Sequence, residues 1–206
     1  MPMRTRAAAL AALTVAALAA GTALTAPAGA APKKAASPEF LAASELPPHP
    51  SSTWTGGPVT DGFPAELAHC LGEGAPAYDY RHRVFHTDLD TGAVQVTVVT
   101  GSPAKGKALA ALLNEEIRSC ADRIEQSDPE IEAEGRYYGS LPVEEGAWVH
   151  GLHTATSWGA TDIHLLSVGR DGRTVTVVGW GQMGDFDDAP VAAFEKTTTK
   201  AVNKLY

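Results

Sequence analysis

The sequence predicts an α+β fold in which an antiparallel β-sheet carries two main helices packed on one face. Two pairs of alternating strands surround turn residues, Asp-Thr-Gly at 90–92 and Asp-Gly at 171–172, and the second is a strong hairpin signal. Apolar stripes at helical spacing follow residues 102–103 and 187–188. Strands joined by hairpins, with the helices grouped apart from them, are typical of an antiparallel sheet.

The N-terminal 30 residues predict a secretory signal peptide. Arg4 and Arg6 precede an uncharged apolar run over 7–20, and Ala-Gly-Ala at 28–30 is a small-residue cleavage site. A retained membrane anchor is the alternative, but the apolar run is shorter than the ~20 residues that span a bilayer. We therefore expect a secreted, extracellular protein without stable membrane insertion after signal cleavage.

Residues 31–60 are rich in Pro, Ala and Gly and predict a tether. A short helix is expected inside it, because Ser37 can cap a helix whose apolar side carries Leu41 and Leu46. Trp54 is the large apolar group expected to fix the tether onto the domain. A single domain is then expected over residues 61–206.

The two cysteines of the sequence, Cys70 and Cys120, predict a disulfide. An even pair in an exported chain is typical of a structural bridge, and closing a loop of about 50 residues stabilises the fold by roughly 4 kcal/mol. One catalytic thiol is the alternative, but it leaves the second cysteine unexplained. Cys120 also falls on the apolar stripe of the long helix, so its side chain is expected to point into the protein.

The regular elements of the domain follow from hydrophobic periodicity. Period-two alternation predicts strands over 78–86 and 94–98, and a helix begins at Ser102-Pro103. Its apolar face is formed by Leu109, Leu113, Ile117, Cys120 and Ile124. Further strands are expected over 136–138, 147–156, 162–168 and 173–180, with a final helix capped by Asp187 and Asp188.

Charge and motifs narrow the classes of function. The chain has 24 acidic and 16 basic residues and a formal net charge of -8, which disfavours nucleic acid as a partner. Neither a Gly-x-Ser-x-Gly nor a His-Glu-x-x-His motif is present. The sequence therefore predicts a protein that is not an enzyme and needs no cofactor.

The histidines and acidic turns do not predict a metal site. His82 and His86 share a strand face but lie about 13 Å apart at ~3.3 Å per residue, too far for one zinc ion. The turn containing Asp88 and Asp90 lacks the Gly and Glu positions of a calcium loop. A site across two strands, such as His150 with His164, is the alternative.

Several segments together resemble a known family. They are SPEFLAASELP at 37–47, Trp54, Cys70, LNEEIRSC at 113–120 and LLSVGRDGRTVTVVG at 165–179. This layout is similar to the PknH-like extracellular sensor domain of actinobacterial Ser/Thr kinases, which also occurs in stand-alone exported proteins. The resemblance implies a strongly bent antiparallel sheet with two helices and a cleft for an extracellular ligand. Members commonly have a second cysteine pair, which this sequence lacks.

The predicted ligand site lies on the sheet face that the two helices leave open. Alternation places Trp148 and His150 on one face of their strand, and Trp180 opposite the helix-facing Val175 and Val177. Aromatic rings on an open face suit stacking on a sugar or another small ligand, whereas a core edge capped by each Trp is the alternative. The candidate residues are Trp148, His150, His164 and Trp180.

The sequence thus predicts a secreted, non-enzymatic, sensor-like domain of the cell envelope. Its partner is an unknown small molecule, a cell-wall fragment or an envelope protein. One alternative is an exported hydrolase in which His150 or His164 acts with Asp162. Another is a domain that binds other envelope proteins.

Overall fold

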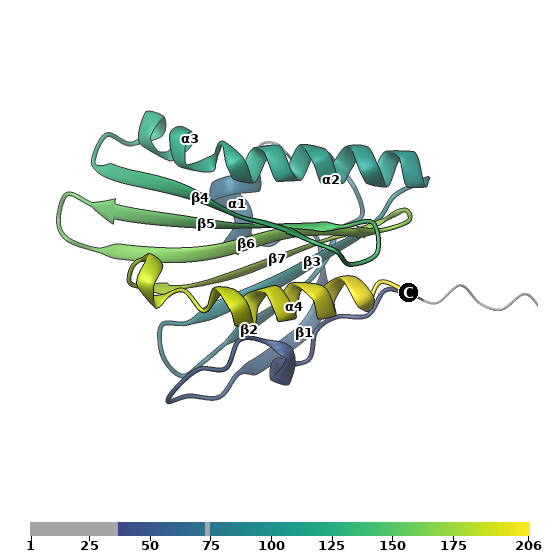
Figure 1. Cartoon of the computed structure of the whole chain (residues 1–206), viewed down its shortest axis with the longest axis horizontal. Coiled ribbons are helices and arrows are strands. Elements are labelled where there is room, and N and C mark those ends of the chain that lie inside the picture. The colour runs from purple at the N-terminus through teal and green to yellow at the C-terminus, as the bar shows by residue number, and fades with distance from the viewer. Residues whose placement is uncertain (1–36, 73–74) are drawn as a thin grey trace, which may run out of the picture. The chain divides into compact units, whose positions relative to one another are not determined.

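The computed structural model describes residues 37–72 and 75–206 (Figure 1). The predicted signal peptide over 1–30 and the first residues of the predicted tether lie outside the described residues. Among the described helices, none is long and apolar enough to cross a membrane.

Seven strands form one antiparallel sheet in the order β1-β2-β3-β7-β6-β5-β4, which confirms the predicted α+β class. Figure 1 shows the strand direction turning gradually from β4 to β1. The strands β5, β6 and β7 correspond to the strands predicted over 147–156, 162–168 and 173–180. The strands are β1 (Thr55–Asp61), β2 (Arg81–His86), β3 (Gly92–Val99), β4 (Ile131–Leu141), β5 (Ala147–Thr156), β6 (Thr161–Asp171) and β7 (Thr174–Met183).

The helices lie between and after the strands. Ser102 caps α2 as predicted, because its Oγ accepts a hydrogen bond from the backbone N–H of Lys105 at 3.3 Å. The long helix predicted after it is divided at Ser119, whose hydroxyl donates to the carbonyl of Glu115 at 2.9 Å. The helices are η1 (Ala43–Glu45), η2 (Ala65–Leu67), α1 (Ala68–Leu71), α2 (Pro103–Arg118), α3 (Cys120–Ser127), η3 (Phe186–Asp188) and α4 (Val191–Asn203).

The prediction that both main helices pack on one face of the sheet is wrong. α2 packs on the face that carries Val168 and Val177, while α4 packs on the face that carries Leu165 and Val178. Both helices contact β5, β6 and β7, so the central strands lie between them. The physical reason is visible in β7, where residues 174–180 are all buried. A strand covered on both faces is apolar along its length rather than alternating.

The segment over 37–54, predicted as part of a tether, belongs to the fold. Leu41 is fully buried in the core beside α4, and its backbone N–H donates to Oε1 of Gln95 at 2.6 Å. The hydroxyl of Thr197 on α4 donates to the carbonyl of Glu45 at 2.7 Å. Trp54 packs against the same core, and its indole N–H donates to the carbonyl of Pro47 at 2.7 Å.

The predicted start of the domain at residue 61 is therefore wrong, because the edge strand β1 begins before it, at Thr55. It pairs with β2, for example through Thr60 with His82. The described chain from residue 37 onward forms one compact unit. The packing of the stretch before residue 61 is not evident from its Pro- and Gly-rich sequence. Extended segments of this kind are held by scattered hydrogen bonds and show no periodic pattern of apolar residues.

Candidate functional site

A cavity of about 620 Å³ lies on the α2 side of the sheet. It is enclosed by strands β2, β3, β7 and β6 and by residues 65–71, which comprise η2 and α1 and which we call the wall segment. Its volume falls within the range of small-molecule sites, which is roughly 300–1,000 Å³. The cavity is the best-formed candidate site in the described part of the chain.

Glycines in two neighbouring strands form the floor of this cavity. The pairing of strands places His86, Gly92, Gly181 and His164 in one row across β2, β3, β7 and β6. A Cβ on Gly181 would lie 2.5 Å from Nδ1 of His164, so glycine is needed for that ring to lie over the strand. Gly in a strand interior is typical of such a close approach.

The next row continues the floor with apolar side chains. Val84, Val94, Gly179 and Leu166 are paired across the same four strands. A Cβ on Gly179 would lie 2.8 Å from Cδ2 of Leu67, which is the point where the wall segment reaches the sheet. The floor of the cavity is thus largely apolar.

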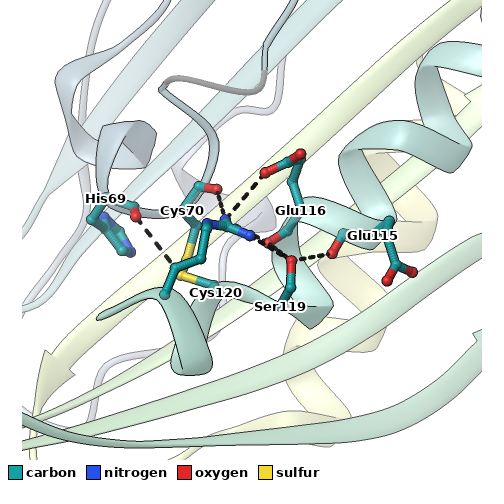
Figure 2. A network of polar contacts seen from close by, with 7 residues as sticks. His69, Cys70, Glu115, Glu116, Ser119 and Cys120 are labelled. Carbon is teal, nitrogen blue, oxygen red and sulfur yellow. Dashed lines mark hydrogen bonds and ion pairs between the residues drawn. A yellow bond between two sulfur atoms is a disulfide. The ribbon is translucent and has the colours of Figure 1, made fainter. Parts of the chain in front are cut away.

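The disulfide between Cys70 and Cys120 confirms the sequence prediction and fixes the wall segment to the start of α3. Figure 2 shows this junction, where the Sγ atom of Cys120 lies 3.8 Å from the carbonyl oxygen of His69. The guanidinium of Arg123 donates to the carbonyl of Cys70 at 2.6 Å and pairs with the carboxylate of Glu116 at 3.3 Å. A covalent bond and a charged hydrogen bond therefore position this side of the cavity.

Two histidines face each other inside the cavity. The ring centroids of His69, on the wall segment, and His164, on β6, are 5.2 Å apart. Burial, together with the nearby His69, lowers the pKa of His164 to about 4. The pKa of His69 is also lowered, chiefly by loss of hydration, although its ring keeps solvent contact and hydrogen-bonds the backbone of Glu66. Both rings are therefore neutral at pH 7.

Three carboxylates contribute to the lining of the cavity. Glu66 comes from the wall segment, Asp162 from β6 and Asp90 from the turn between β2 and β3. Asp90 also accepts a hydrogen bond at 3.2 Å from the backbone N–H of Met183. Of the described residues that line the cavity, none is Lys or Arg.

The structure separates the four residues predicted to bind a ligand. His164 lines the cavity, and Trp180 borders it from the strand β7 that forms part of the floor. The indole of Trp180, however, is 5% exposed and packs in the core beside α4, on the other face of the sheet. Trp148 packs against the core beside α2, outside the lining of the cavity.

His150 lies beneath α2 rather than in the cavity. It is 4% exposed, and its Nε2 is 2.8 Å from Oδ1 of Asn114 on α2. Its ring also packs against Tyr137, at 5.0 Å between centroids. Burial, with a smaller contribution from Arg118, lowers the pKa of His150 to about 4. These contacts give His150 a structural role between α2, β5 and β4.

The predicted open sheet face is not found over β5, β6 and β7, because α2 and α4 pack against the two opposite faces of these strands. The sequence indicates a short helical turn from Pro64 to Cys70, but sequence reasoning did not identify its side chains Glu66, Leu67 and His69 as part of a site. The signal that could have located the floor was Gly179-Trp180-Gly181, two glycines at period two within a buried strand.

The described residues do not form a metal centre. Within 37–72 and 75–206, no three His, Cys, Asp or Glu side chains come together closely enough to hold an ion. In the pairing of β5 with β6, Leu152 rather than His150 stands opposite His164. Asp88 and Asp90 lie in a polar turn, where the backbone N–H of Asp88 donates to Ser52 at 3.2 Å.

The lining of the cavity bears on the hydrolase alternative. Asp162 and His164 share a face of β6 and both line the cavity. The described lining contains no Ser, Thr, Cys, Tyr or Lys, so it offers no hydroxyl, thiol or amine nucleophile. The chemistry open to this arrangement is the binding of a ligand or proton transfer through a weakly basic imidazole.

Comparisons with known proteins do not assign the chain to a family. A search against family models and a search of curated proteins both found no match. The similarity to PknH-like sensor domains stays a prediction from the sequence.

Proposed function

We propose that this protein is an exported, sensor-like domain that binds a small molecule in the cavity between the wall segment and the sheet. The observation that carries the proposal is the glycine floor. Gly92 leaves open space on its strand, Gly179 and Gly181 let Leu67 and His164 pack directly onto the neighbouring strand, and the resulting cavity of about 620 Å³ has the size of a ligand site.

Binding is favoured over catalysis by the groups that line the cavity. His164 has a pKa of about 4 and is a weak base at neutral pH, and the described lining supplies no hydroxyl, thiol or amine nucleophile. A rigid wall also suits binding, because a site that is formed before the ligand arrives loses less conformational entropy on binding. The disulfide and Arg123 supply that rigidity.

The proposed location outside the cytoplasm rests on two features. The first 30 residues have the charge and hydrophobicity of a secretory signal, and the Cys70–Cys120 disulfide is typical of oxidising compartments. In that setting the ligand would be an extracellular metabolite or a cell-wall fragment. An envelope protein that inserts a side chain into the cavity is the remaining partner class.

A thermal-shift screen with a blocked-cavity variant tests this function. A Cβ on Gly92 would meet only the carbonyl oxygen of Phe85, at 3.9 Å, so Gly92→Val should place a side chain on the open part of the cavity floor. A ligand that raises the melting temperature of the wild type should leave that of Gly92→Val unchanged. Gly135→Ala, in a strand outside the cavity, is the control and should respond like the wild type. Equal shifts in all three proteins would exclude the cavity as the site.

A further inference from the structure

The charge and shape of the cavity identify the class of its ligand, an inference that rests on the proposed function. We propose that the cavity binds a small organic cation with a flat apolar body. The carboxylates of Glu66, Asp90 and Asp162 would hold the cationic group, and the glycine floor would contact the flat part.

The described lining carries three carboxylates and no Lys or Arg. The three carboxylates come from separate elements, the wall segment, the β2–β3 turn and β6. None of them takes part in the ion pairs formed between described residues. His69 and His164 add no positive charge at pH 7, because the pKa of each is lowered. The lining therefore attracts cations and repels anions.

The shape of the lining sets the form of the ligand. The backbone is open at Gly92, while the Leu67 side chain and the His164 ring lie against Gly179 and Gly181. Val94 and Leu166 continue this apolar floor, so a flat ring can lie beside Gly92 against these side chains. The rings of His69 and His164 stand beside this floor as further flat surfaces.

The lining of the cavity does not suit a simple sugar as the preferred ligand. Sugar sites commonly present a Trp or Tyr ring on which the sugar stacks. Among the described lining residues the only such side chain is that of Trp180, and its indole packs on the opposite face of the sheet. A phosphate or carboxylate group would find no Lys or Arg in the described lining. The positive charge of the ligand is thus the feature that the cavity recognises.

Three matched probes test this assignment. Naphthylmethylamine, naphthylmethanol and naphthoate share one flat ring system and differ in charge. Titration calorimetry with the full chain at pH 7 and low salt should show the amine binding about tenfold more tightly than the alcohol, and the carboxylate binding most weakly. The preference for the amine should decrease as the salt concentration rises.

Variants locate the charges that cause the preference. Asp162→Asn and Glu66→Gln should each bring the affinity of the amine closer to that of the alcohol. Glu132→Gln, an exposed carboxylate of β4 outside the cavity, is the matched control and should leave the preference unchanged. Thermal melting of each variant shows that it is folded, and the exposed Glu66 gives a second test if Asp162→Asn does not fold.

The outcomes separate the two proposals. Equal affinity for the three probes, or tightest binding of naphthoate, would overturn the cation assignment. If Gly92→Val abolished that binding, the cavity would still be the ligand site. If none of the probes bound, the cation assignment would be overturned, and an absence of binding by every compound in the thermal-shift screen would overturn the proposed function as well.

Discussion

The imidazole rings of His69 and His164 lie 5.2 Å apart, one on the wall segment and the other on β6. They meet because Gly181, the partner of His164 on β7, has no side chain to displace the ring. The wall segment therefore contacts the sheet through two imidazole rings, each of which can gain a proton. At this distance two protonated rings would repel each other, so the contact requires that they stay neutral.

We predict that the fold loses stability as the pH falls from about 6.5 to about 4. In this window the unfolded chain binds more protons than the folded one, because the folded pKa of His164 is about 4 and that of His69 is also lowered. Above the window these histidines are neutral in both states. Between pH 7 and pH 4.5, denaturant unfolding should show a loss of about 2 kcal/mol more in the wild type than in His164→Gln. Identical losses in the two proteins would contradict the prediction.

The contact between His150 and Asn114 predicts a structural effect without an effect on ligand binding. Asn114→Ala removes the hydrogen-bond partner of a buried imidazole and should lower the free energy of unfolding by about 1–3 kcal/mol. The affinity for a cavity ligand should stay at the wild-type value, since neither residue lines the cavity. A loss of affinity in a folded Asn114→Ala protein would show that His150 acts on the site after all.

Removing the disulfide should destabilise the protein strongly. The bridge joins residues 50 positions apart, so the variant with both Cys70→Ala and Cys120→Ala should lose about 4 kcal/mol of unfolding free energy. Guanidinium unfolding measures this loss, and reduction of the wild type should reproduce most of it. A loss below about 1 kcal/mol would mean that the unfolded chain is already constrained without the bridge.

Leu41 tests whether the 37–54 segment belongs to the folded domain. Its side chain is fully buried beside α4, so Leu41→Ala should lower the free energy of unfolding by about 3 kcal/mol. Glu39→Ala is the control, because the Glu39 side chain is exposed and its hydrogen bond to Lys204 uses the backbone. Similar stability of the two variants, measured by denaturant unfolding, would show that the 37–54 segment is a tether outside the folded domain.

Much of the fold could be predicted from local patterns. The hairpin at residues 171–172, the cap at Ser102 and the bridge between Cys70 and Cys120 all stand where the sequence placed them. β1 and the docking of Leu41 could not be predicted, because a Gly- and Pro-containing edge strand and an extended segment have no apolar period. The predicted packing of α4 on the same face as α2 is wrong, because it rests on apolar and polar residues alternating in β6 and β7. Both strands are instead buried on two sides.

The candidate site was harder to predict than the fold. Alternation places Trp180 on the face opposite Val175 and Val177, but α4 covers that face. His150 lies beneath α2, and only His164 and Trp180 of the four predicted residues border the cavity. Which face a Trp occupies depends on the register of β7 with its neighbours, and periodicity gives that only relative to an assumed helix position. The wall segment comes from a short stretch next to Cys70, and its place over the sheet depends on long-range contacts, namely the disulfide, the hydrogen bond from Arg123 and the packing of Leu67 on Gly179.

The hydroxyl of Thr197 reaches the carbonyl of Glu45 across 152 positions of sequence, and the backbone of Glu39 meets that of Lys204. The two ends of the described chain therefore complete one core together. During synthesis, a nascent chain that has not yet released α4 from the ribosome cannot bury Leu41, whatever its strands have formed. Pairings of such long range also close slowly. We expect the polypeptide to reach its native state only after α4 has emerged from the ribosome, and until then a chaperone would protect the exposed core.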